Sequence, residues 1–219
     1  DAHFVGHPLL DELQKVKHIT KENFVRQNQL EHKKEIIALL PGSRKQEVSR
    51  MLEIMLKVVD RFPNYQFVIA CAPSLTEDFY KKIVGNANVH LVFNKTYQLL
   101  QVASAALVTS GTATLETALF YVPEVVCYKG NPISYLIAKN LINVKYIRLV
   151  NLLMDKPVLK VSIQNDLTPD NISEELKLLL SNHKKQLQIL DDYEDLRIVL
   201  GNTGASFNAA RSEERRVGK

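Results

Sequence analysis

The sequence is poor in the residues that form disulfide frameworks and metal centres. Its 219 residues include two cysteines and six histidines, and no spacing among them matches a metal-ligand motif. Cys71 and Cys127 both lie in apolar, strand-like runs, so we expect buried, reduced thiols of the kind found in cytosolic proteins. No apolar run is long enough to cross a bilayer, and no segment resembles a signal peptide.

Several catalytic and binding signatures are missing as well. No Gly-Lys-Ser or Gly-Lys-Thr sequence is present, which excludes an ATPase phosphate loop. No histidine is arranged with a serine or cysteine as a nucleophile–base pair, so we interpret all six as structural or solvated. The formal net charge of +4 falls to +2 without the last nine residues, which carry four basic and two acidic side chains. This balance does not indicate a nucleic-acid partner.

The two ends of the chain differ from its middle. The first residue is Asp1 rather than methionine, and residues 4–8 read as the end of a strand followed by a linker. Residues 211–219 have no apolar periodicity, and we interpret them as an artefactual tail. We therefore expect a piece of a longer protein. A hydrophobic content of 46% is enough for one sizeable core.

Strand-like and helix-like segments alternate along the chain. The expected strands are residues 35–40, 65–71, 89–93, 105–109 and 123–128. The expected helices are residues 46–61, 74–84, 96–103, 112–120 and 132–141, followed by 173–181 and 183–200. Buried strands that alternate with amphipathic helices predict an α/β fold, a Rossmann-like parallel sheet flanked by helices, with further helices at the C-terminal end.

The first candidate site is the turn between the first strand and the first long helix. It reads Pro41-Gly42-Ser43-Arg44. Gly42 allows close approach of the backbone, the helix N-terminus offers free N–H groups, and Arg44 can bind a phosphate through two parallel donors. A simple turn with a solvated arginine is the alternative.

The second candidate site follows the fourth strand, where Thr109, Ser110, Gly111 and Thr112 lead into a helix that contains Glu116. Backbone N–H groups and hydroxyls at this junction could hold a diphosphate. Glu116, about one turn into the helix, could accept hydrogen bonds from ribose hydroxyls. The alternative is that Ser110 or Thr112 caps the helix and Glu116 only interacts with the helix dipole.

Two later segments are less informative. Asn151 is either a turn residue or a substrate contact, and the local sequence favours the turn. Tyr135, Leu136 and Ile137, with nearby lysines, could place the helix over residues 132–142 at a membrane surface. A core-facing helix with solvated lysines is the alternative that the pattern favours.

Four motifs occur in a fixed order over residues 3–210. They are Val5-Gly6-His7-Pro8-Leu9, Leu39–Arg44 with Glu47, Ser110–Glu116, and Asn151-Leu152-Leu153. This ordered set resembles the lipid-A-disaccharide synthase family. One departure is the segment Lys160-Val161-Ser162-Ile163-Gln164, where the family usually reads Lys-Glu-Leu-Ile-Gln.

The resemblance implies the C-terminal half of a two-domain glycosyltransferase of the B fold that is inverting and needs no metal or other cofactor. Such an enzyme transfers a 2,3-diacylglucosamine unit from UDP to 2,3-diacylglucosamine 1-phosphate in lipid A biosynthesis. The resemblance also implies a hexosyltransferase that is cytoplasmic and peripheral at the inner face of the inner membrane. The C-terminal helices would pack against the N-terminal domain or against a partner chain, as in a homodimer.

The resemblance also assigns residues and domains. Arg44 matches the family's essential loop arginine, Glu116 the carboxylate on the ribose, and Asn151 a functional asparagine, while the catalytic aspartate lies in a domain absent from this chain. The donor-binding set is Gly42, Ser43, Arg44, Ser110, Gly111, Thr112 and Glu116. The expected units are 1–30 (end of an N-terminal domain and linker), 31–170 (nucleotide-sugar-binding domain), 171–210 (C-terminal helices) and 211–219 (the tail).

Two other functions remain open on the sequence. One is a different UDP-sugar enzyme of the same architecture, such as a UDP-N-acetylglucosamine 2-epimerase or a peptidoglycan glucosaminyltransferase. The other is a non-catalytic nucleotide-binding module. UDP binding is common to all of these interpretations, so calorimetry with UDP tests what they share.

Overall fold

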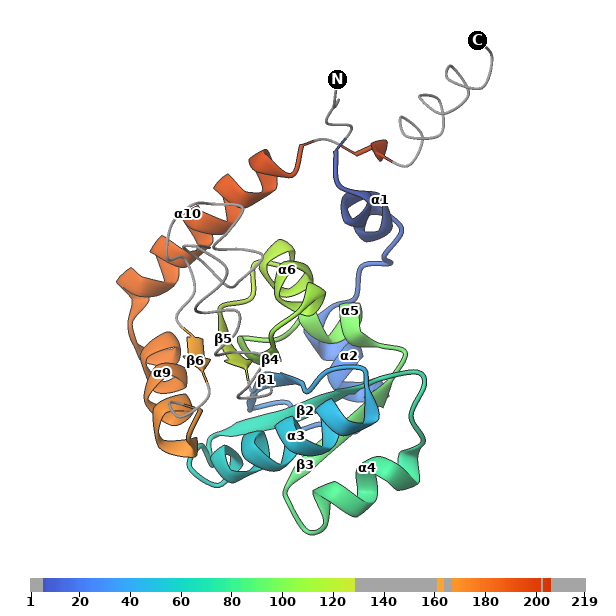
Figure 1. Cartoon of the computed structure of the whole chain (residues 1–219), viewed down its shortest axis with the longest axis vertical. Coiled ribbons are helices and arrows are strands. Elements are labelled where there is room, and N and C mark those ends of the chain that lie inside the picture. The colour runs from blue at the N-terminus through green and yellow to red at the C-terminus, as the bar shows by residue number, and fades with distance from the viewer. Residues whose placement is uncertain (1–5, 129–160, 164–166, 202, 206–219) are drawn as a thin grey trace, which may run out of the picture.

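The centre of the molecule is one parallel β-sheet with helices on both faces (Figure 1). The structure is a computed structural model that describes residues 6–128, 161–163, 167–201 and 203–205. Within these ranges the sheet has six strands in the order β3-β2-β1-β4-β5-β6. Every neighbouring pair is parallel, which confirms the predicted fold class.

The strands begin and end close to where the sequence predicts. They are β1 (Glu35–Leu40), β2 (Tyr65–Cys71), β3 (Val89–Phe93), β4 (Ala105–Thr109), β5 (Glu124–Tyr128) and β6 (Val161–Ile163). The first four match the predicted bounds, and β5 begins one residue later. The three-residue strand β6 was not predicted, because so short a run carries no periodicity.

The helices follow the predicted alternation, with additions near the start. They are α1 (Pro8–Gln14), α2 (Lys21–Gln27), α3 (Lys45–Val59), α4 (Glu77–Val84), α5 (Thr96–Leu100), α6 (Thr112–Leu119), α9 (Pro169–Ser181) and α10 (His183–Val199). Neither α1 nor α2 was predicted. The helix expected at 132–141 lies outside the described residues. None of the helices in the described ranges has the length and apolarity to cross a bilayer.

Alternate residues of the central strands face two separate cores. Ile37 and Leu39 of β1 pack with α3, α6, α9 and α10, whereas Ile36 and Ala38 pack on the opposite face with α2 and α5. This alternation follows from the two-residue period of a strand. Because Phe24 of α2 is fully buried, the segment before residue 30 contributes to the same fold. The predicted domain boundary between residues 30 and 31 stays a prediction.

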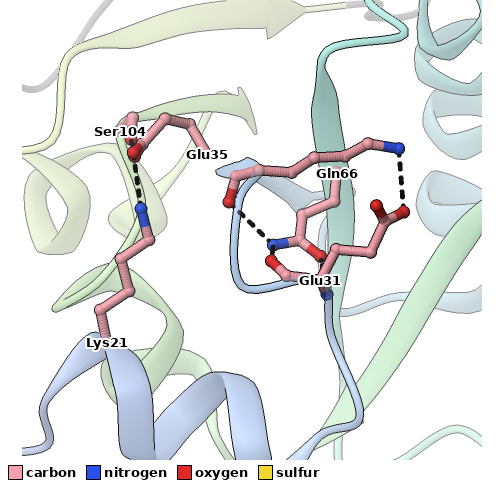
Figure 2. A network of polar contacts seen from close by, with 6 residues as sticks. Lys21, Glu31, Glu35, Gln66 and Ser104 are labelled. Carbon is pink, nitrogen blue, oxygen red and sulfur yellow. Dashed lines mark hydrogen bonds and ion pairs between the residues drawn. The ribbon is translucent and has the colours of Figure 1, made fainter.

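Two polar clusters hold the N-terminal ends of the strands (Figure 2). Lys21 of α2 contacts the Glu35 carboxylate at 2.6 Å, and the Ser104 hydroxyl donates to the same carboxylate at 2.5 Å. Nearby, the buried amide of Gln66 accepts from the Glu31 N–H and donates to the carbonyls of Glu31 and Lys34. These contacts attach α2 and the following loop to the sheet. They also satisfy the amide of Gln66, as expected for a buried polar side chain.

The first and last described segments lie side by side (Figure 1). The His7 N–H donates to the Leu200 carbonyl at 3.1 Å, and the Gly204 N–H donates to the Asp11 carboxylate at 2.5 Å. His7 also caps α1, because its Nδ1 accepts from the Leu9 N–H. The histidine expected in a linker is therefore the start of a helix.

Both cysteines are buried and free, as the sequence predicts. Burial raises the pKa of the Cys71 thiol and of the Cys127 thiol to about 12. Both thiols therefore stay protonated at neutral pH and are inert side chains of the core.

Candidate functional site

The strand order places the two predicted corners next to each other. Strands β2 and β3 extend the sheet on one side of β1, and β4, β5 and β6 extend it on the other. The order therefore reverses between β1 and β4, where Leu40 pairs with Val108. In open parallel sheets the crevice beyond the carboxyl ends of the strands at such a point is the usual ligand site.

A cleft of about 430 Å³ opens at this point. It is lined by both corners, by the carboxyl end of β2 with the residues that follow it, and by the start of α5. All seven residues predicted to bind the donor line it: Gly42, Ser43, Arg44, Ser110, Gly111, Thr112 and Glu116. The structure thus brings the predicted set together, while the role of each residue stays a prediction. Asn151 lies outside the described residues.

The first corner depends on a glycine in the left-handed region. Gly42 has φ +109°, which only glycine adopts readily. The Glu47 side chain folds back over it, and its carboxylate accepts from the Ser43 N–H at 3.2 Å. A Cβ at Gly42 would lie 2.2 Å from Glu47 Oε2. Glu47 therefore shapes this loop, a role that its place in the motif did not predict.

The second corner begins a helix that no side chain caps. Gly111 is the N-cap of α6 and its backbone is extended. No side chain makes a capping hydrogen bond at this end of α6, and the Thr114 hydroxyl donates back to the Gly111 carbonyl at 2.7 Å. The alternative in which Ser110 or Thr112 caps the helix is therefore wrong. The first N–H groups of α6 face a cleft that can accept an anion.

A buried hydroxyl between the two corners has no partner. Thr109 ends β4 and is 6% exposed, and within the described ranges its Oγ1 makes no hydrogen bond. The same residue lines the cleft and a second hollow of about 430 Å³, and both are also lined by Arg44. Buried polar groups are nearly always paired, so this hydroxyl is available to a ligand in the cleft.

The charge of the site is mixed. Arg44 is the N-cap of α3, is exposed, and forms no ion pair with any residue that the structure describes. Lys45 and Arg50 join it around the second hollow. With the N-terminus of α3, these side chains make one wall of the site attractive to a polyanion.

Glu116 supplies the opposite charge in the same cleft. Burial raises the pKa of its carboxyl, while a hydrogen bond from the Tyr97 hydroxyl at 3.2 Å lowers it. A half-buried carboxylate held in this way can accept hydrogen bonds from sugar hydroxyls. The cleft therefore combines donors for phosphate with an acceptor for hydroxyl groups.

Two residues of the site were not predicted from the sequence. Thr96 lines the cleft at the start of α5, and Tyr97 contacts Glu116. The signal was available for both, because α5 follows a strand whose carboxyl end lies at the same edge of the sheet. No three His, Cys, Asp or Glu side chains in the described part of the chain are grouped as a metal site would require.

Solved structures of glycosyltransferases and epimerases have this fold. A spinosyn rhamnosyltransferase solved with spinosyn aglycone gives a TM-score of 0.60 at 8% identity over 85% of this chain and 47% of that chain. A glycosyltransferase involved in lipopolysaccharide biosynthesis gives 0.51 at 15% over 90% and 52%. A UDP-N-acetylglucosamine 2-epimerase gives 0.53 at 14% over 94% and 51%. At these identities the likeness concerns the fold.

Sequence relatives are more specific. The chain is 39% identical over 217 residues to the lipid-A-disaccharide synthase of Syntrophus aciditrophicus (strain SB), covering 96% of this chain and 56% of that protein. It is 34% identical over 212 residues to that of Coxiella burnetii (strain Dugway 5J108-111), covering 95% and 56%. It thus spans just over half the length of these relatives. The family model for lipid-A-disaccharide synthetase matches residues 1–211, and the chain belongs to this family.

Proposed function

We propose that this chain binds the UDP part of a sugar donor for a glycosyltransferase that makes the lipid A disaccharide. The enzyme would move a 2,3-diacylglucosamine unit from UDP to 2,3-diacylglucosamine 1-phosphate. Family membership supports the reaction, and the cleft supports the part that this chain takes in it. The acceptor is a lipid, so we expect the whole enzyme to work as a peripheral protein at the inner face of the inner membrane.

The observation that carries the donor site is the meeting of two corners in one cleft. Arg44 and Ser43 lie at the start of α3, and Gly111 and Thr112 lie at the uncapped start of α6. The α6 corner offers N–H donors, and Arg44 adds a guanidinium that can grip two phosphate oxygens. Glu116 lies farther along α6, where the ribose of a nucleotide with its diphosphate at the corner would reach.

The chemistry that this arrangement supports is stabilisation of a leaving group. When the bond between the sugar and UDP breaks, negative charge grows on the diphosphate. Donors fixed before the reaction stabilise that charge without reorganising, and losing one typically lowers the rate by about 10²–10³-fold. The base that activates the acceptor hydroxyl would come from outside this chain, and no metal is required by the proposal.

The first test is direct binding. Calorimetry should detect UDP binding to the 219-residue chain, and Arg44→Ala should weaken it. In the full-length enzyme the same change should lower turnover at least tenfold. Arg26→Ala is the matched control, because Arg26 lies in α2 and its guanidinium donates to Asn23 on the same helix. Normal turnover of the Arg44 variant would remove this residue from the site.

A second measurement distinguishes the reaction from others on the same fold. The full-length enzyme should use acylated glucosamine donors and acceptors, and should not convert UDP-N-acetylglucosamine to its 2-epimer. Product analysis with acylated and water-soluble substrates decides between the two. Turnover of the soluble substrate alone would replace the proposed reaction with an epimerase or a peptidoglycan glucosaminyltransferase.

A further inference from the structure

The Glu116 carboxylate is held by a tyrosine from a different element. Tyr97, in the first turn of α5, donates its hydroxyl to Glu116 Oε1 at 3.2 Å. Its ring also packs against Phe120, with the ring centroids 5.5 Å apart and an interplanar angle of 37°. Glu116 lies in α6, and Phe120 is the C-cap of that helix, four positions later on the same face. Tyr97 therefore contacts both side chains and fixes the first relative to the second.

The hydrogen bond has a defined direction. Burial, together with the nearby Glu116 carboxylate, raises the pKa of Tyr97 to about 12. The phenol therefore remains protonated at physiological pH and can only donate to the carboxylate. Within the described ranges Glu116 Oε2 has no hydrogen-bond partner. One oxygen of the carboxylate is thus occupied, and the other is left for a ligand.

We infer that Tyr97 is a positioning residue that makes the cleft selective for a ribonucleoside diphosphate over its 2′-deoxy counterpart. Tyr97 does not line the cleft itself, so it acts through Glu116. By holding Oε1, it aims Oε2 at the ribose hydroxyls and reduces the rotamer entropy that the carboxylate loses on binding. This inference rests on the proposed donor site and adds a determinant of its sugar specificity.

The experiment compares UDP with 2′-deoxy-UDP by calorimetry on the 219-residue chain. The ratio of the two dissociation constants isolates the contact with the 2′-hydroxyl, because the rest of the nucleotide is the same in both ligands. Tyr97→Phe should lower the preference for UDP about three- to tenfold, the effect of one hydrogen bond. Binding of 2′-deoxy-UDP should change less than about twofold. Tyr65→Phe, which removes a hydroxyl at the start of β2, should leave the ratio unchanged.

A double variant tests whether Tyr97 acts through Glu116. Glu116→Gln should reduce the preference by itself, and adding Tyr97→Phe to it should reduce the preference no further, because coupled residues are not additive. The preference should also fall on acidification at a higher pH in Tyr97→Phe, because the pKa of Glu116 rises when the hydrogen bond that lowers it is lost. A stability defect would not move this pH profile.

The outcomes separate the two proposals. If the wild-type chain does not bind UDP, the donor site and this inference are both wrong. If it binds UDP and Tyr97→Phe leaves both the preference and its pH profile unchanged, the donor site stands and the role of Tyr97 is overturned. An additive effect in the double variant also overturns it, since Tyr97 would then act independently of Glu116.

Discussion

Gly42 and Gly111 both line the cleft, but their backbones differ. Gly42 has φ +109° and its missing Cβ would meet the Glu47 carboxylate. Gly111 is extended, and a Cβ there would meet nothing within 4 Å. The first glycine is therefore needed by the fold of the loop, whereas the second leaves open space at the cleft.

These differences predict opposite effects of two alanine variants. Gly42→Ala should destabilise the protein by about 1–3 kcal/mol through backbone strain. Gly111→Ala should change stability by less than about 0.5 kcal/mol, but should weaken UDP binding about tenfold by spoiling one hydrogen bond to the diphosphate. Urea unfolding and calorimetry measure the two quantities.

Gly85 provides the control for strain. It has φ +54° and nothing near its missing Cβ, so Gly85→Ala should destabilise the protein and leave UDP binding unchanged. Wild-type affinity in Gly111→Ala would mean that the diphosphate does not approach the backbone at the second corner.

At the same scale, residue types predicted which residues line the cleft better than they predicted the contacts among those residues. Gly42, Arg44 and Glu116 could be chosen because each lies near the end of a buried strand, where a parallel sheet binds ligands. The contact from Tyr97 to Glu116 could not, because it joins side chains 19 residues apart whose meeting depends on how α5 and α6 pack. Tertiary packing, rather than local sequence, fixes such pairs.

At the scale of elements, strands were predicted more accurately than short helices. The runs that form β1, β2 and β4 are buried on both faces, so each reads as a continuous apolar segment with sharp ends. Helices α1 and α2 have seven residues each. Two turns carry too few apolar positions to show a helical period, and only their caps, His7 and Thr20, mark where they begin.

The attachment of α2 to the sheet should depend on pH. A hydrogen bond from Lys21, which is the largest cause, and a second one from Ser104 lower the pKa of Glu35. Because its pKa is lower in the folded state than in the unfolded state, Glu35 stabilises the fold above the ordinary glutamate range, and this contribution is lost as the pH falls through the lower, folded value. At pH 7, Glu35→Gln should lower the free energy of unfolding by less than about 1 kcal/mol, since the pair is partly exposed.

Urea unfolding at a series of pH values checks this prediction. The difference between wild type and Glu35→Gln should persist from pH 7 to about pH 5 and shrink below about pH 4. Glu53→Gln, at an exposed position in α3, should show no such trend. A difference that stays constant down to pH 3 would mean that the lost contact does not involve the carboxylate charge.

At the scale of the whole molecule, binding and catalysis should separate. The chain spans 56% of the length of the relatives it matches, and the resemblance to this family predicts a catalytic base outside the 219 residues. We therefore expect the 219-residue chain to bind UDP without forming disaccharide. Product analysis with acylated donor and acceptor tests this, with the full-length enzyme as the positive control. Disaccharide made by the chain alone would require a base among the residues present here.

The contact between the first and last described segments has a mechanical consequence. A pull applied through residues 6 and 205 would load the hydrogen bonds from His7 to Leu200 and from Gly204 to Asp11 first. Tension applied there would therefore break these two contacts before it reached the β-ladders.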